Sequence, residues 1–287
     1  MALVVGNATV ATGMSRLVEA GLYADEIFKD GVTFTSQYDV SEAGQIQIEK
    51  YAPDLTLEPV TPGSNFTDSD YQNTVININC NNGFHASQKV PAYYEATMPT
   101  DVKMNQVLRT TENVRIVRQK SGIGVLVDEG TEFESKDPIT ADNVKAVALS
   151  MIEALTKKYA KPNVALITPE VYTAIVTHAG KEFTPILNDN INESGRIGTW
   201  LGILWITAPL LNSANLKYVQ ESGTSKAVDA SSVEMVMYDF KAFSIIDKLN
   251  LLRVIDSEDF AGSKIQEELA VGFKVTNPDC VLVKKNA

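Results

Sequence analysis

Two segments with strand-like alternation flank a long loop that is interrupted by prolines. Residues Gln45–Ile48 alternate polar and apolar side chains after Gly44, and Ile76, Ile78 and Cys80 alternate with asparagines. The loop between them includes Pro53, Pro59, Pro62 and Gly63. Period-2 alternation is typical of a strand with one apolar face, and the prolines favour a loop. The pattern predicts a protruding two-stranded arm, which is marginally stable alone and must rest on its own chain or on a neighbouring molecule.

The clearest helical pattern covers residues 141–160. Apolar side chains follow the spacing of one helical face there, and Thr140 is a candidate N-cap. A strand is predicted at Val164–Ile167, and a second helix begins with Thr168-Pro169-Glu170 and runs to about His178. A helix, a strand and a helix joined by short turns indicate an α+β or α/β protein.

Weaker patterns predict the remaining elements. Residues 1–30 are expected to form an arm with a short helix, and residues 32–35 a strand. A helix is predicted over residues 100–120, with Ser121-Gly122 ending it. Further strands are predicted at residues 203–206, 216–219, 233–238, 243–246, 269–275 and 281–283.

The charge balance argues against nucleic-acid binding as the main task of this chain. The sequence holds 25 basic and 36 acidic residues, which give a net charge of −11, and no run of Lys or Arg is longer than two. A nucleic-acid-binding protein neutralises phosphates with a basic stripe, which this sequence lacks. We expect an acidic surface that keeps the chain soluble.

Residues that could carry chemistry are few. His85 is predicted in a loop after a strand and His178 at a helix end, as ordinary surface or capping residues. Cys80 and Cys280 lack the CxxC spacing of a zinc site, so each is expected as a small buried side chain in a strand. The sequence nominates no catalytic, cofactor-binding or metal-binding residue, and we expect no cofactor and no enzymatic activity.

Three short polar or glycine-containing motifs are interpreted as turns or loop tips. Ser121–Gly124 lacks the third glycine and the strand-to-helix context of a dinucleotide site. Gly195–Gly198 precedes the apolar run Trp200–Leu211, which is too short to span a bilayer. Asp68–Asp70 lacks the glycine and the distant glutamate of a calcium loop.

Three longer stretches resemble parts of one known fold. In Asn163–Tyr172 an apolar strand leads through Thr-Pro into a short helix. In Ile197–Leu210 glycines and tryptophans precede an apolar run and Ala-Pro-Leu, and in Leu269–Val281 a Gly-Phe-x-Val run precedes a proline turn. Together with the arm, the extended loop and the long helix before them, this order resembles the Hong Kong 97 fold of tailed-phage major capsid proteins.

The resemblance implies an α+β architecture in four parts. The extended two-stranded loop would be the E-loop, the long helix the spine of the P-domain, and the later α/β segment a compact A-domain. The implied boundaries are residues 1–31 for the N-arm, 32–162 for the P-domain, with an E-loop at about 45–80 and a spine helix at about 100–120, 163–248 for the A-domain, and 249–287 for a C-terminal return to the P-domain.

The same resemblance implies a structural function. Copies of the chain would assemble as hexamers and pentamers into an icosahedral shell that encloses phage double-stranded DNA without sequence-specific binding. The implied partners are further copies of the chain, a separate scaffolding protein, a portal and a decoration protein, and no membrane is involved. Assembly would take place in the host cytoplasm, and the chain would end in the virion capsid.

In this fold the E-loop lies over an adjacent subunit. The candidate inter-subunit contacts are therefore the apolar and aromatic residues of this segment together with one lysine, namely Ile46, Ile48, Lys50, Tyr51, Leu55, Leu57, Phe66, Tyr71, Ile76 and Ile78. No motif identifies Lys50 as part of a covalent crosslink, so that chemistry is not carried over.

Three alternatives stay open at this point. An encapsulin-type nanocompartment is a shell of the same fold that encloses cargo enzymes, and a shorter E-loop would favour it. A small-molecule α/β enzyme would use some of the scattered acidic residues and would form a small oligomer. A cell-surface or tail binding module would carry more repeats and more exposed aromatic residues.

Overall fold

The computed structural model of the chain describes residues 27–28, 32–33, 45–51, 73–80, 82–97, 102–179, 196–220 and 222–287. The predicted arm over residues 1–30 lies almost entirely outside these residues. So do the rest of the strand predicted at residues 32–35, the loop tip at Asp68–Asp70, and the candidate contacts Leu55, Leu57, Phe66 and Tyr71.

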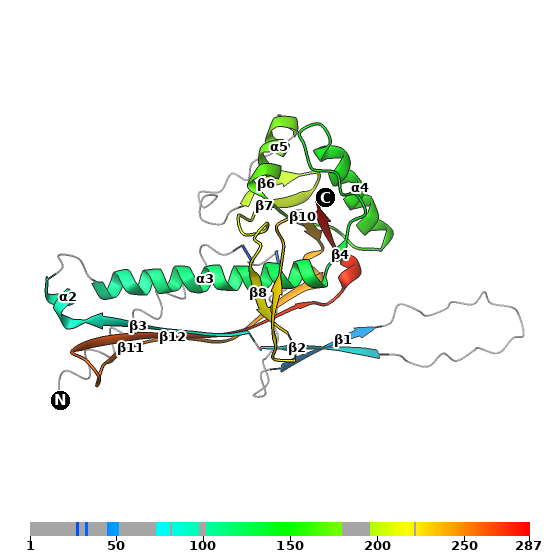
Figure 1. The fold of residues 1–287 in the computed structure, drawn as a ribbon. Coiled ribbons are helices and arrows are strands. Elements are labelled where there is room, and N and C mark those ends of the chain that lie inside the picture. Colours follow the sequence, from blue (N-terminus) through cyan, green and yellow to red (C-terminus); the bar gives the residue numbers. More distant parts are fainter. Residues whose placement is uncertain are drawn as a thin grey trace, which may run out of the picture.

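One half of the molecule is a long antiparallel sheet with a helix lying along it (Figure 1). The strand order is β11 (Phe243–Asp256), β12 (Gly262–Val275) and β3 (Asn82–Pro91). Helix α3 (Val102–Glu129) packs on β12, and the short helix α2 (Ala92–Thr97) follows β3 at the far end. Every second residue of β12 from Ser263 to Val271 is buried, because the pleat turns these side chains toward one face of the sheet.

Helix α3 is longer than the sequence predicted, and the turn predicted at Ser121–Gly124 is wrong. The helix continues through these residues to Glu129. Its glycines make room for neighbours, because a Cβ on Gly122 would lie 2.5 Å from Phe28 Cε2 and one on Gly124 would touch Tyr218 at 3.4 Å. Close packing on several sides therefore outweighs the low helix propensity of glycine.

The other half of the molecule is a mixed six-stranded sheet (Figure 1). Its strand order is β4 (Thr131–Glu132), β13 (Val281–Lys285), β10 (Val233–Tyr238), β5 (Val164–Ile167), β7 (Ile203–Thr207) and β6 (Arg196–Trp200). The pairs β5–β7 and β4–β13 are parallel, and the others are antiparallel. The strand prediction at residues 164–167 is confirmed, as are those at 203–206 and 233–238.

The six-stranded sheet is buried on both faces. Ala165 and Ile167 belong to one apolar cluster with α4 (Val144–Lys157) and α5 (Pro169–Ala179), while Val164 and Leu166 belong to another with α3 and the long sheet. This explains why β5 is apolar at every position. The sheet is thus the layer that joins α4 and α5 to the elongated half.

The two helices predicted around residues 141–178 are confirmed, but one cap is not. Val171 N–H donates to Thr168 Oγ1 at 3.4 Å, as the Thr-Pro start of α5 predicts. Thr140 does not cap α4, because Asn143 immediately precedes that helix and accepts a hydrogen bond from the Thr140 N–H at 2.7 Å. α4 packs against α5, although the predicted boundary at residue 162 separates them, and that boundary stays a prediction.

Several smaller predictions are wrong. His85 lies within β3 and not in a loop, and Arg196–Trp200 forms β6 in place of the predicted turn. Cys80 directly follows a strand and Cys280 lies in a short 3₁₀ helix, Pro278–Cys280, and both are only half-buried. His85, Cys80 and Cys280 are placed by segments distant in sequence, which local patterns cannot show, whereas β6 forms a hairpin with the neighbouring β7.

The remaining elements complete the connection between the two halves. The hairpin of β8 (Leu216–Val219) and β9 (Ser225–Val228) packs on α3, and a short 3₁₀ helix, Phe240–Ala242, leads into β11. The strand predicted at residues 243–246 is present and continues to Asp256.

Candidate functional site

A two-stranded ribbon extends sideways from the body (Figure 1). Strand β1 (Gln45–Tyr51) pairs antiparallel with β2 (Asn73–Asn79) along its whole length. The register places Ile46 opposite Ile78 and Ile48 opposite Ile76. These isoleucines therefore share one face of the ribbon, and the two predicted strands with their pairing are confirmed.

The described part of the ribbon is a two-stranded sheet of its own. Among the strands that the structure describes, β1 and β2 pair only with each other. Ile78, near the root, is 1% exposed, whereas Val75, farther out on the other face, is 47% exposed. An isolated two-stranded sheet is marginally stable in water. The outer part of the ribbon thus gains by lying on another surface.

The root of the ribbon is held tightly against the long sheet. A Cβ on Gly272 of β12 would lie 2.9 Å from the carbonyl oxygen of Asn79, so only glycine permits this approach. The Asn82 side chain, just beyond the root, accepts a hydrogen bond of 2.6 Å from the Val219 N–H of β8. The direction of the ribbon is therefore set by contacts with β12 and β8.

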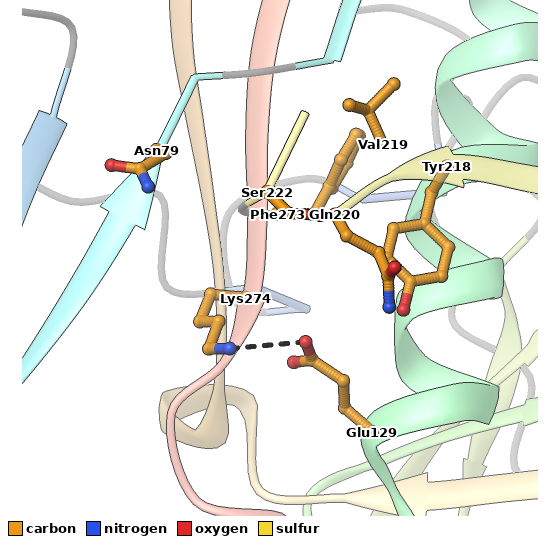
Figure 2. A pocket seen from close by; sticks show the side chains of 8 residues that line it. All are labelled: Asn79, Glu129, Tyr218, Val219, Gln220, Ser222, Phe273 and Lys274. Carbon is orange, nitrogen blue, oxygen red and sulfur yellow. Dashed lines mark hydrogen bonds and ion pairs between the residues drawn. The ribbon is translucent and has the colours of Figure 1, made fainter. Parts of the chain in front are cut away.

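A cavity of about 310 Å³ lies beside this root, and Figure 2 shows the residues that line it. Asn79 comes from the ribbon, Tyr218 and Gln220 from the β8 side, and Lys274 from β12. Lys274 Nζ pairs with Glu129 Oε1 at 3.2 Å, and the other oxygen of Glu129 accepts the Val275 N–H at 3.1 Å. The charged groups of the cavity thus serve to join α3 to β12.

The residue before Glu129 joins α3 to the β8–β9 hairpin. Asp128 accepts hydrogen bonds from Tyr218 Oη at 2.5 Å and from Lys226 Nζ at 2.6 Å. Burial raises the pKa of Asp128, but the bonds from Lys226 and Tyr218 outweigh burial and hold this pKa below its usual value. Asp128 and Glu129 lie in the last turn of α3, where negative charges interact unfavourably with the helix dipole. Their ion pairs with Lys226 and Lys274 offset this unfavourable interaction.

The structure places the predicted site residues as follows. On β1 lie Ile46, Ile48, Lys50 and Tyr51. On β2, Ile78 lies opposite Ile46 and Ile76 lies opposite Ile48. The anchoring residues Gly272 and Asn82 were missed, because their partners lie far away in sequence and no local signal marks them.

The described residues contain no group of three or more His, Cys, Asp or Glu side chains that could hold a metal ion. Within the same part of the chain, no helix combines the length and the apolar character needed to cross a membrane. His85 and His178 lie on different elements, β3 and α5.

Known proteins match this chain in structure, but the searches by sequence found no match. Neither a family model nor a curated protein matches the chain. The capsid structure of cyanophage P-SCSP1u superposes with a TM-score of 0.67 at 12% identity, covering 93% of this chain and 86% of that one. The mature capsid of bacteriophage PhiM1 superposes with a TM-score of 0.60 at 14% identity, covering 91% of each chain.

The chain has the phage capsid fold. The resemblance to the Hong Kong 97 fold is therefore confirmed at the level of the fold, including its mixed helix and sheet composition. A virus-like particle from Pyrococcus furiosus has the capsid fold too, with a TM-score of 0.57 at 10% identity, covering 95% of this chain and 98% of that one. Because the coverage is high in both directions, the capsid fold accounts for nearly the whole chain.

Proposed function

We propose that this chain is the major capsid protein of a tailed bacteriophage. In this proposal, copies of the chain assemble as hexamers and pentamers into an icosahedral shell around double-stranded DNA. The observation that carries the proposal is the β1–β2 ribbon, whose described strands pair only with each other and carry isoleucines on one face. A second copy of the chain is the surface that would cover the outer part of this face, beyond the buried Ile78, since many weak contacts in a closed symmetric array sum to a stable shell.

The parts of the fold then take the following roles. The ribbon is the base of the E-loop, the long sheet with α3 forms the P-domain, and the six-stranded sheet belongs to the A-domain. The boundaries at residues 31, 162 and 248 are part of this proposal. The packing of α4 onto α5 favours counting α4 with the A-domain as well.

The proposed role is structural and not enzymatic. The ion pairs described above link α3 to its neighbours, so their chemistry is used in holding the subunit together. The proposed partners beyond further copies are a scaffolding protein, a portal and a decoration protein. Assembly would take place in the host cytoplasm, and the product would be the virion capsid.

A nanocompartment shell is the second candidate, because the similarity to the Pyrococcus furiosus virus-like particle extends over nearly all of both chains. The two candidates differ in what the particle encloses. Nuclease-protected DNA in particles purified from infected cells supports the capsid, and a protein cargo without DNA supports the nanocompartment.

The ribbon offers a matched pair of variants for testing assembly. Ile76→Lys places a charge on the isoleucine face of β2, and Val75→Lys places the same charge on the opposite, exposed face. We expect Ile76→Lys to remain folded, by circular dichroism and thermal melting, but to sediment as small species. Val75→Lys should form particles visible by negative-stain electron microscopy. Particle formation by both variants at the wild-type level would refute the role of the ribbon.

A further inference from the structure

One buried carboxyl group takes no part in the proposed shell function. Glu267 lies on β12 and is 3% exposed, and neither of its carboxylate oxygens has a hydrogen-bond partner among the residues that the structure describes. In the sheet it stands between Leu252 of β11 and Ala86 of β3. The alternation of β12 turns it, with Ile265 and Leu269, toward the buried face on which α3 packs.

In the described part of the chain, the strands beside Glu267 place no cation on its face of the sheet. The strand neighbours on its face are Phe84 and Gln88 of β3 and Val254 of β11. The charged or titratable side chains nearby in the sheet stand on its opposite face, namely His85, Lys89, Arg253, Lys264 and Glu268.

Helix α3 turns mainly apolar or internally satisfied groups toward the sheet. Val107 and Val114 are buried, and the Thr110 hydroxyl donates to the Gln106 carbonyl oxygen at 2.8 Å. The buried cation of α3 is Arg118. Burial raises the pKa of Glu267, to about 7.

We propose that Glu267 makes the packing of α3 on the long sheet depend on its own protonation. The neutral carboxyl group is tolerated between the helix and the sheet, whereas a buried carboxylate without hydrogen-bond donors is strongly unfavourable. On ionisation the group must gain water, and α3 must move away from the sheet to admit it. The elongated half of the subunit is then more rigid below neutral pH than above it.

The direction of the effect follows from the two protonation equilibria. The pKa of Glu267 lies near 7 in the folded chain and near 4.5 in an ordinary environment, so the folded state binds the proton more tightly. The stabilisation is complete below the ordinary value and is lost as the pH rises through the folded value. The difference corresponds to a change of up to about 300-fold in the unfolding equilibrium constant.

The test compares Glu267→Gln with the control Glu268→Gln, whose carboxylate is exposed on the other face of the same strand. Thermal melting of the full, unassembled chain is followed between about pH 5.5 and pH 8.5. We expect the melting temperature of the wild type and of Glu268→Gln to fall by several degrees as the pH rises to about 7 and to level off above it, and that of Glu267→Gln to stay nearly level throughout. The same pH dependence in wild type and Glu267→Gln would overturn the proposal.

A second measurement needs no variant. Hydrogen exchange of the α3 amides, corrected for the intrinsic pH dependence of exchange, should show protection in the Val107–Arg118 region decreasing as the pH rises through 7. Protection that is independent of pH in this region would contradict the proposal even if Glu267→Gln failed to fold. Neither experiment depends on shell formation, so its outcome is separate from that of the capsid proposal.

Discussion

The two glycines inside α3 should respond in opposite directions to the same substitution. Replacing glycine by alanine within a helix ordinarily adds about 1 kcal/mol of stability. At Gly124 the new methyl group would lie 3.4 Å from Tyr218 Cδ1, which is an ordinary contact, so Gly124→Ala should keep about 0.5–1 kcal/mol of this gain. At Gly122 the methyl group would lie 2.5 Å from Phe28 Cε2 and 3.1 Å from Phe273 Cε1, and it must displace a ring.

The displaced ring has little room to move. Phe28 is 3% exposed, and its ring centroid lies 5.4 Å from that of Phe243. Overpacking of this kind costs roughly 1–3 kcal/mol, which exceeds the helix-propensity gain in all but the mildest case. We therefore expect Gly122→Ala to be destabilising by up to about 2 kcal/mol, the net of the two effects.

Thermal or urea denaturation of the unassembled chain measures both variants. For a chain of this size 1 kcal/mol corresponds to roughly 2 °C in melting temperature, so the two variants should differ by about 1–6 °C. If both variants are equally stable, or if Gly122→Ala is the more stable of the two, the glycines do not provide space for close packing.

Three further perturbations test other parts of the fold. Lys284 is fully buried, donates to the Asp137 and Lys285 carbonyl oxygens and lies 3.5 Å from Glu234. Lys284→Ala should therefore lower the free energy of unfolding, measured by urea denaturation, by about 3–5 kcal/mol. A loss below about 1 kcal/mol would contradict this network. Trp205→Phe removes the bond from Nε1 to the Trp200 carbonyl oxygen (2.9 Å) and should cost about 1–3 kcal/mol while leaving the far-ultraviolet circular dichroism unchanged. Asp128→Asn should lower the melting temperature at neutral pH, because the folded pKa of Asp128 lies below 3.8 and its ionised form contributes stability above that value. The difference from wild type should vanish as the pH falls below the folded pKa, and a constant difference would show that the ion pair is not its cause.

Local patterns in the sequence were sufficient where an element buries one regular face. The stripe at Val144, Ala148, Met151 and Leu155 predicted α4, since every one of these residues is buried in the structure. The alternation of β1 and β2 predicted the ribbon in the same way. It could not show how firmly the root is fixed, because Asn82 and Val219 are 137 residues apart in the chain.

The failures have a common physical cause in long-range packing. Gly122 and Gly124 have the composition of a turn, but Phe28 and Tyr218 occupy the space that their missing side chains leave, and the helix continues. Glu267 was also missed, although the alternation Leu269, Val271, Phe273 continued backwards by two residues places it on the buried face. A charged residue at such a position is contrary to ordinary strand composition, so it draws attention only once the register is known.

The ribbon formed by β1 and β2 is proposed to complete its packing on a second copy of the chain. A cryo-electron-microscopy map of assembled particles tests it directly, because the chain path through the ribbon can be traced from its root at Asn79. The account predicts closed icosahedral particles in which the isoleucine face of β1 and β2 lies on a neighbouring subunit. Particles in which the ribbon folds back onto its own body, or a chain that remains monomeric with the ribbon packed on itself, would contradict it.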